Sequence, residues 1–409
     1  MIEVEIDKSE PEGNGYATGG RFIFGNKETP IPFKSTSIAK TNTTEYDILE
    51  NENLHSPREY FALIQNREHA FNLFGDKEDS LLIRTEFHEN INRTFEKIST
   101  DKDFNFVYLY FKESLPKINR KIVENMYDVL DSPYNHMLVI PMPPSIDNIE
   151  SVKTIVDVFK NRKSMVDLDR PLMGTIPHTV NENVMETLIN FYIENEINVF
   201  GIDMNGSRPR GLILNLIKRK IIENDKIKKN NYILYLFNLA KAQYIKRNVR
   251  PINDILTVMY GIDGFNNQRF VRGGQKWTDM SPKQQQYKID NVRFRILDDY
   301  GEYNKFGLLD SEFNFDKNNE TNILNKKSYS TIYDVEKTKK AYDTLYNHSK
   351  WHNWILTHKE LNTSIRKEIE EQRLLKYFKD KKYIKNEIDS YLAEDPTLNN
   401  YRTEEKTLV

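Results

Sequence analysis

The feature that most constrains the fold is a regular alternation of short apolar runs with longer segments of helical spacing. Apolar, β-branched or aromatic runs occupy residues 106–110, 137–140, 172–176, 199–202 and 232–237. The segments between them carry helical patterns, for example at 117–130, 149–159, 182–194 and 211–223. Each repeat of about 25 to 35 residues has the size of one βα unit. Strands that are apolar throughout predict a parallel sheet covered on both faces, and hence an α/β protein.

The number of these units favours a closed barrel over a short open sheet. A sixth apolar run at 81–83 is taken as a further strand, and no G-x-G-x-x-G follows the first strand. The expected fold is therefore an α/β, (β/α)8 TIM-type barrel with an N-terminal β layer and a C-terminal helical segment. A doubly wound sheet is the alternative.

Three regions are expected along the chain. Residues 1–74 form an N-terminal β and helix elaboration, in which 56–75 has helical spacing. Residues 75–296 form the barrel. Residues 297–409 begin with a polar excursion and continue with C-terminal helices, because apolar residues recur at helical spacing over 334–392.

Composition excludes several kinds of site. The chain of 409 residues has no cysteine, so it forms no disulfide, no Cys-ligated zinc site and no iron–sulfur cluster. We expect no metal and no cofactor. No apolar run approaches the roughly 18 to 20 residues of a membrane span, and the N-terminus lacks the apolar segment of a signal peptide. The expectation is a cytoplasmic protein with no membrane partner.

Polar residues at the ends of the expected strands are the candidate site, because chemistry in such barrels sits at the carboxyl ends of the strands. Asp203 directly follows an apolar run, and Asp263 lies in a Gly-rich turn region; each is a candidate catalytic carboxylate or a turn-forming cap. Glu86, after the run at 81–83, is a third candidate. The candidate substrate-binding residues are Gly201, Asn205, Gly206, His178, Phe265 and Asn266.

A histidine pair near the C-terminus has a possible metal-binding spacing. His348 and His352 are four residues apart and would share one helix face, but the glutamate of H-E-x-x-H is absent. Trp351 and Trp354 lie between and beside them. Helix packing therefore explains the cluster better than a metal site does.

A basic segment suggests a nucleic-acid partner. Residues 207–250 carry twelve Lys and Arg residues against two acidic ones, in a chain of net charge -2. Such a stripe predicts contacts with phosphates, although it could also be the solvated outer face of two helices. The candidate nucleic-acid-binding residues are Arg208, Arg210, Lys226, Lys228, Lys229, Arg247, Arg250, Arg269 and Arg272.

Three short motifs, taken in their order along the chain, resemble a known family. Gly20-Arg21-Phe22-Ile23-Phe24-Gly25, with Glu28-Thr29-Pro30, is similar to the opening strand G-R-L-x-x-x-G-x-x-E-T-P of the tRNA-guanine transglycosylase superfamily. Gly261-Ile262-Asp263-Gly264-Phe265-Asn266 is similar to its late motif G-[IV]-D-x-F-D, and His352-Asn353 resembles its C-terminal His-Asn. The resemblance implies a (β/α)8 barrel that exchanges guanine for a 7-deazaguanine in a nucleic acid.

The departures from that family are specific. The last Asp of the late motif, which is the family's nucleophile, is Asn266 here, and a neutral amide cannot form the glycosyl ester. The family's D-S-G motif has no clear counterpart, and Arg84-Thr85-Glu86-Phe87 lies where it would be sought. The family's zinc site needs three cysteines, and this chain has none.

Three functions remain open from the sequence. The first is an active base-exchange enzyme on tRNA or DNA, in which Asp203 or Asp263 attacks the sugar and the target base is flipped into the barrel mouth. The second is a nucleic-acid-binding subunit without catalysis that forms a homodimer or heterodimer with a transglycosylase-like subunit. The third is an α/β enzyme acting on a small metabolite.

Overall fold

The computed structural model divides the chain into two compact units. The first comprises Met1–Ser9, Ala17–Leu239 and Tyr260–Gln268, and the second Glu10–Tyr16, Ala240–Met259 and Arg269–Val409. The structure describes residues 2–7, 17, 19–24, 26–38, 56–97, 104–115, 118–143, 149–163, 170–177, 180–207, 220–221, 232–239, 250–251, 254–267, 276–290, 292, 294–297, 303–306 and 339–381.

The first unit is built on a parallel sheet that almost closes on itself. Its strand order is β4-β13-β11-β10-β9-β8-β7-β6-β5, and every neighbouring pair is parallel. The strands are β4 (Phe33–Lys34), β5 (Thr36–Ser37), β6 (Arg58–Ile64), β7 (Asn105–Phe111), β8 (Met137–Ile140), β9 (Leu172–Pro177), β10 (Val199–Asp203), β11 (Ile233–Leu239) and β13 (Gly264–Asn267). The molecule is thus a mixed α/β protein with a barrel-like sheet, consistent with a TIM-type fold.

The two edges of this sheet belong to one short segment that is interrupted at Ser35. On one side, the backbone N–H of Ser35 donates to the carbonyl of Phe265 in β13 over 3.0 Å. On the other, Thr36 N–H donates to the carbonyl of Pro57, just ahead of β6, over 2.8 Å. The segment therefore bridges the first and last long strands of the sheet, which is why the sheet comes close to closing.

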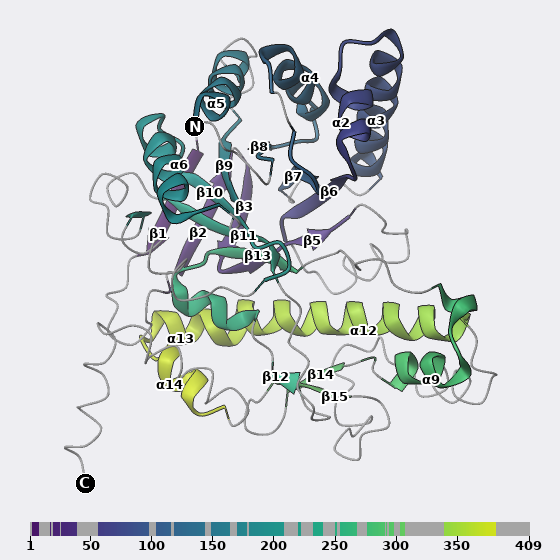
Figure 1. Ribbon diagram of the computed structural model, residues 1–409. Coiled ribbons are helices and arrows are strands. Elements are labelled where there is room, and N and C mark those ends of the chain that lie inside the picture. The colour runs from purple at the N-terminus through teal and green to yellow at the C-terminus, as the bar shows by residue number, and fades with distance from the viewer. Residues whose placement is uncertain are drawn as a thin grey trace. The chain divides into compact units, whose positions relative to one another are not determined.

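Helices follow the strands and lie around the outside of the sheet (Figure 1). Three of them begin at an Asn whose side chain accepts a hydrogen bond from the backbone N–H three residues on: Asn66, Asn119 and Asn181. Such caps satisfy one of the free N–H groups at a helix start. The helices are α2 (Arg67–Phe74), α3 (Glu78–Glu96), α4 (Arg120–Leu130), α5 (Ile149–Lys163) and α6 (Glu182–Glu194).

Two local expectations from the sequence are wrong. Residues 58–64 are strand β6 and not helix; Tyr60, Phe61, Leu63 and Ile64 fit either spacing, because short apolar runs do not distinguish a strand from a buried helix. Residues 81–83 lie in α3 and not in a strand. Their side chains are exposed, that of Leu82 by 72%. The parallel sheet therefore starts ahead of residue 75.

The first unit also holds a separate antiparallel sheet. Its strands β1 (Ile2–Asp7), β2 (Gly19–Phe24) and β3 (Lys27–Ile31) pair in chain order. This is the N-terminal β layer expected from the sequence.

The second unit is mainly helical among its described residues. Its longest helix is α12 (Lys339–Lys359), which continues into η4 (Glu360–Ile365) and α13 (Arg366–Glu370). The other described elements are β12 (Arg250–Pro251), η2 (Ile255–Tyr260, whose last residue falls in the first unit), η3 (Trp277–Asp279), α9 (Pro282–Asp290), β14 (Phe294–Leu297), β15 (Tyr303–Phe306) and α14 (Leu374–Lys379). No helix in the described part of the chain is long and apolar enough to cross a membrane.

Candidate functional site

Alternate residues of the barrel-like sheet share one face and pack their rings together. Tyr108 of β7 stacks on Phe237 of β11 with ring centroids 3.9 Å apart. Phe106 meets Tyr235 edge-on at 5.5 Å, and Phe61 of β6 lies 5.9 Å from Tyr108. Side chains from strands far apart in the sheet order can touch in this way only across the inside of a curved sheet. The inside is therefore filled with aromatic rings, and polar groups stand out against them.

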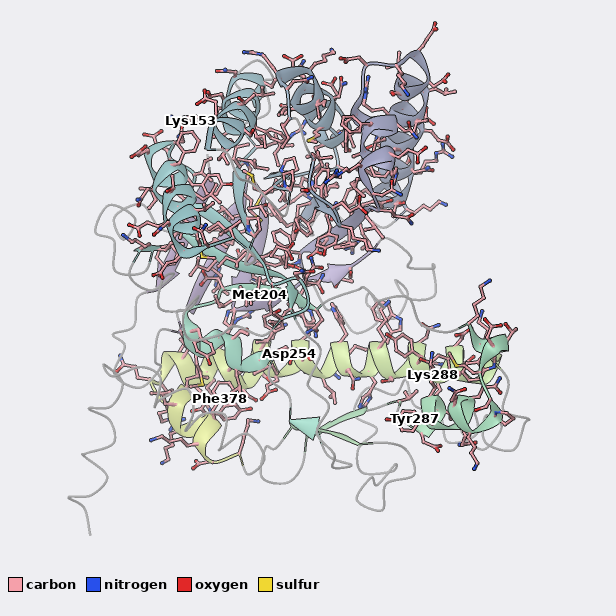
Figure 2. All side chains as sticks on the ribbon, viewed as in Figure 1. Lys153, Met204, Asp254, Tyr287, Lys288 and Phe378 are labelled. Atoms are coloured by element: carbon pink, nitrogen blue, oxygen red, sulfur yellow. The ribbon has the colours of Figure 1, made fainter. Side chains whose placement is uncertain are left out.

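Asp203 is the first of these polar groups. It is the last residue of β10 and only 9% exposed. Its Oδ1 accepts hydrogen bonds from the side-chain amide of Asn238 over 2.8 Å and from the backbone N–H of Asn205 over 2.9 Å. The hydroxyl of Tyr108 lies beside this carboxylate and interacts with it electrostatically. Met204, labelled in Figure 2, directly follows it in the chain. Asp203 is thus a carboxylate held in one orientation at the carboxyl end of the strand.

The turn after Asp203 is joined to β11 by an unusual backbone. Asn205, Gly206 and Asn238 have positive φ angles of 45°, 73° and 51°. The N–H of Gly206 donates to the carbonyl of Asn238 over 2.8 Å, and the hydroxyl of Tyr110 donates to Asn205 Oδ1 over 2.7 Å. Asn is among the few residues other than Gly that adopt this backbone readily. Such conformations concentrate at functional sites, where surrounding bonds hold them.

Tyr108 stays protonated beside Asp203. Burial raises its pKa well above the ordinary value, and the nearby carboxylate of Asp203 raises it further. The side chains of Tyr110 and Glu59 act in the same direction. At neutral pH the Tyr108 hydroxyl is therefore a neutral polar group beside the carboxylate.

Glu59 is a second buried carboxylate, which was not among the residues predicted from the sequence. It lies on β6 and is 2% exposed. Its Oε2 accepts from the hydroxyl of Tyr235 over 2.6 Å and from the side-chain amide of Asn266 over 3.0 Å. The only signal in the sequence was an acidic residue that opens the run Tyr60-Phe61-Ala62-Leu63-Ile64. Because that run was interpreted as part of a helix, Glu59 was not placed on a strand.

Two predicted site residues on or beside β13 are placed away from Asp203. Asp263 precedes the strand at its amino end, and its Oδ2 accepts from the backbone N–H of Leu234 over 2.7 Å. Its carboxylate therefore joins the starts of two strands. Phe265 lies on the opposite face of β13 from Asn266, with the ammonium of Lys34 5.7 Å from its ring centroid.

Gly201 is needed for packing within the sheet. A Cβ there would lie 2.3 Å from Cε2 of Phe237 and 2.8 Å from Sδ of Met173. The space above this glycine is therefore taken by a ring of the protein itself. Gly201, a candidate substrate-binding residue from the sequence, therefore serves packing at this position.

The remaining predicted residues do not join this cluster. Glu86 is exposed on α3, and not at a strand end. His178 lies outside the described residues, as do all the candidate nucleic-acid-binding residues except Arg250, whose backbone is in β12.

The C-terminal histidines lie within helix α12 and are packed. His352 and His358 are buried, and the ring of His358 lies 3.9 Å from that of Trp354. Burial lowers the pKa of His348. Within the described ranges there is no group of three or more His, Asp or Glu residues arranged to hold a metal ion.

The arrangement offers two buried carboxylates, each held by neutral donors, inside a barrel-like sheet. Asp203 is at a strand end, and Glu59 is bonded to Asn266, near the carboxyl end of β13. Such groups can act as nucleophiles or as general bases, or can orient a polar ligand. No family model matches the chain, and no curated protein matches it.

Proposed function

We propose that the chain is a divergent base-exchange transglycosylase that replaces guanine by a 7-deazaguanine in tRNA or DNA. The observation that carries the proposal is Asp203, a buried and oriented carboxylate at the carboxyl end of a barrel strand. The fold needed for it is a (β/α)8 barrel, with β4 and β5 counted as one interrupted first strand. The motifs from Gly20 to Pro30 and from Gly261 to Asn266 support the same interpretation.

The proposed chemistry has two steps. A carboxylate oxygen of Asp203 attacks C1′ of the target nucleotide, the C1′–N9 bond breaks, and guanine leaves with the bonding electrons and takes up a proton. The incoming deazaguanine then loses the proton from its N9, attacks C1′ and displaces Asp203. The basic residues between Arg208 and Arg250 would hold the phosphates while the base is flipped out of its stack.

The test is the exchange of labelled guanine into tRNA and into DNA. Asp203→Asn keeps an oxygen that accepts from Asn238, and removes the charge. We expect it to lose activity by roughly 10⁴-fold, the size of loss seen when a catalytic group of this kind is removed. Glu96→Gln is the matched control, since it changes an exposed carboxylate of α3 to its amide. Equal activity of Asp203→Asn and the wild type would contradict the proposal.

Nucleic-acid binding is tested separately by reversing the charge of Lys226, Lys228 and Lys229. Binding should weaken, and the slope of log K against log salt should fall by about 0.9 for each duplex phosphate that the chain no longer neutralises. No affinity of the wild-type chain for any tRNA or DNA at low salt would contradict the nucleic-acid partner.

A second function is favoured by one observation. The amide of Asn266 stands at the position of the family's nucleophile and is bonded to Glu59. A chain with that bond could be a non-catalytic, nucleic-acid-binding subunit that pairs with an active transglycosylase-like subunit. Tight tRNA or DNA binding without base exchange, together with a stable dimer in light scattering, would favour this second function.

A further inference from the structure

The side-chain amide of Asn266 is fixed in one orientation. Its Oδ1 accepts from the backbone N–H of Asn267 over 2.9 Å, and its Nδ2 donates to Glu59 Oε2 over 3.0 Å. An N–H needs an acceptor and an ionised carboxylate can only accept, so rotating the amide by half a turn would break both bonds. The orientation of this amide follows from its two partners.

Glu59 is in turn held in place by a second strand. Its Oε2 also accepts from the hydroxyl of Tyr235 over 2.6 Å, so one oxygen atom joins β6, β11 and β13. Burying a carboxylate is costly unless donors surround it, which makes this set of bonds rigid. Glu59 thus acts on Asn266 by fixing its amide.

One N–H of Asn266 has no acceptor in the part of the chain that the structure describes. The residue is 5% exposed and next to last in β13, near the carboxyl end of the strand. Buried amide N–H groups are nearly always hydrogen-bonded. An oriented donor without a protein acceptor at this end of a barrel strand is suited to an acceptor atom of a ligand.

We propose that Asn266 is a specificity residue that donates this N–H to the carbonyl oxygen of a 6-oxopurine base, and that Glu59 is its positioning residue. The inference rests on the proposed function, which defines the ligand as a purine base. Guanine and 7-deazaguanine share the carbonyl oxygen at C6, and only guanine has a ring nitrogen at position 7. A donor to the shared oxygen serves both bases of an exchange. Adenine, which has an amino group there, would be rejected.

The experiment measures binding of free guanine and adenine by calorimetry and exchange activity in parallel. The wild type should bind guanine more tightly than adenine. Asn266→Asp replaces the donor by an acceptor of the same shape and should weaken guanine binding about 10- to 100-fold. Glu59→Gln can still accept from both partners, and should weaken it less than Glu59→Leu, which leaves the amide free to turn.

A double variant separates binding from folding. Asn266→Asp alone sets two carboxylates against each other and should lower the melting temperature at pH 7. Glu59→Gln with Asn266→Asp reverses the direction of the bond and should restore the melting temperature, but not guanine binding. This comparison also tests the roles of Asn266 and Glu59 if the Glu59→Leu variant fails to fold. Glu96→Gln is the control for all measurements.

The outcomes distinguish the inference from the proposed function. Guanine binding that depends on Asn266 in a chain without exchange activity supports the inference and contradicts the enzyme. Exchange activity of the wild type, together with a guanine affinity that is unchanged in Asn266→Asp, overturns the inference but is compatible with the proposed enzyme. Recovery of guanine binding in the double variant, or no guanine binding by the wild type at millimolar concentration, also overturns it.

Discussion

The side-chain amide of Asn238 donates to the carboxylate of Asp203 over 2.8 Å, which joins the carboxyl ends of the neighbouring parallel strands β10 and β11. Asn238 makes this bond from a backbone with φ 51°. The side chain of Asn238 and its backbone conformation both affect the stability of the folded protein. Two substitutions at this position separate the two effects.

Asn238→Gly and Asn238→Ala both remove the donor, but only glycine adopts the positive φ without strain. We expect Asn238→Ala to be less stable than Asn238→Gly by about 1 to 2 kcal/mol. Urea unfolding of the two variants measures the difference. An alanine variant as stable as the glycine variant would show that the backbone relaxes at this position.

Tyr108→Phe tests the hydroxyl that lies beside Asp203. A polar hydroxyl next to a carboxylate favours the charged form of that carboxylate, so its removal should raise the pKa of the Asp203 carboxyl. If Asp203 must be ionised for base exchange, the acidic limb of the pH–rate profile then moves to higher pH, by about one unit.

The matched control for that variant is Tyr192→Phe. Tyr192 is another buried tyrosine, whose hydroxyl donates to the backbone carbonyl of Thr175 over 2.9 Å. Its loss should lower stability without moving the pH–rate profile. A profile that moves equally in both variants would contradict the role of Tyr108.

Much of the sheet could be predicted from the sequence, because five of its strands are continuous apolar runs between helical segments. Strands β4, β5 and β6 could not. The first two have two residues each, and their place depends on pairing with β13 and with β6. The local spacing of β6 fits a helix equally well, and the segment is a strand because it pairs with β7.

A residue of the candidate site could be predicted only where the sequence of a single strand reveals it. Asp203 was found because it directly ends an apolar run. Glu59 was missed because its partners Tyr235 and Asn266 are 176 and 207 residues away in sequence. Local pattern carries no information on contacts of that range, since they arise only when the sheet curves.

Gly201→Ala tests the packing beneath the site. The added Cβ would meet the ring of Phe237 at 2.3 Å, and that ring is stacked on Tyr108 and cannot move freely. We expect a loss of about 1 to 3 kcal/mol in the free energy of unfolding, as in other overpacked cores. Adding Phe237→Leu to Gly201→Ala should recover part of the loss. Additive losses in the double variant would mean that the two residues do not clash.

His136 should make the fold sensitive to acid. Its Nδ1 accepts from the backbone N–H of Asn105 over 2.9 Å, at the start of β7. Burial, with smaller contributions from the positive charges of Lys27 and Arg170, lowers its pKa to about 3. The unfolded chain binds a proton at the ordinary pKa near 6.5, where the folded chain does not. The stability from the neutral ring is therefore complete above pH 6.5 and is lost as the pH falls toward 3.

His136→Gln removes this titration and keeps an oxygen that can accept from Asn105. Relative to the variant, the wild type should lose about 2 kcal/mol of unfolding free energy between pH 6.5 and pH 5, at about 1.4 kcal/mol per pH unit. Urea unfolding at pH 7, 6 and 5 measures the difference between the two proteins, so that groups common to both cancel. A difference between wild type and His136→Gln that stays constant with pH would show that the ring at 136 takes up its proton equally in the folded and unfolded chain.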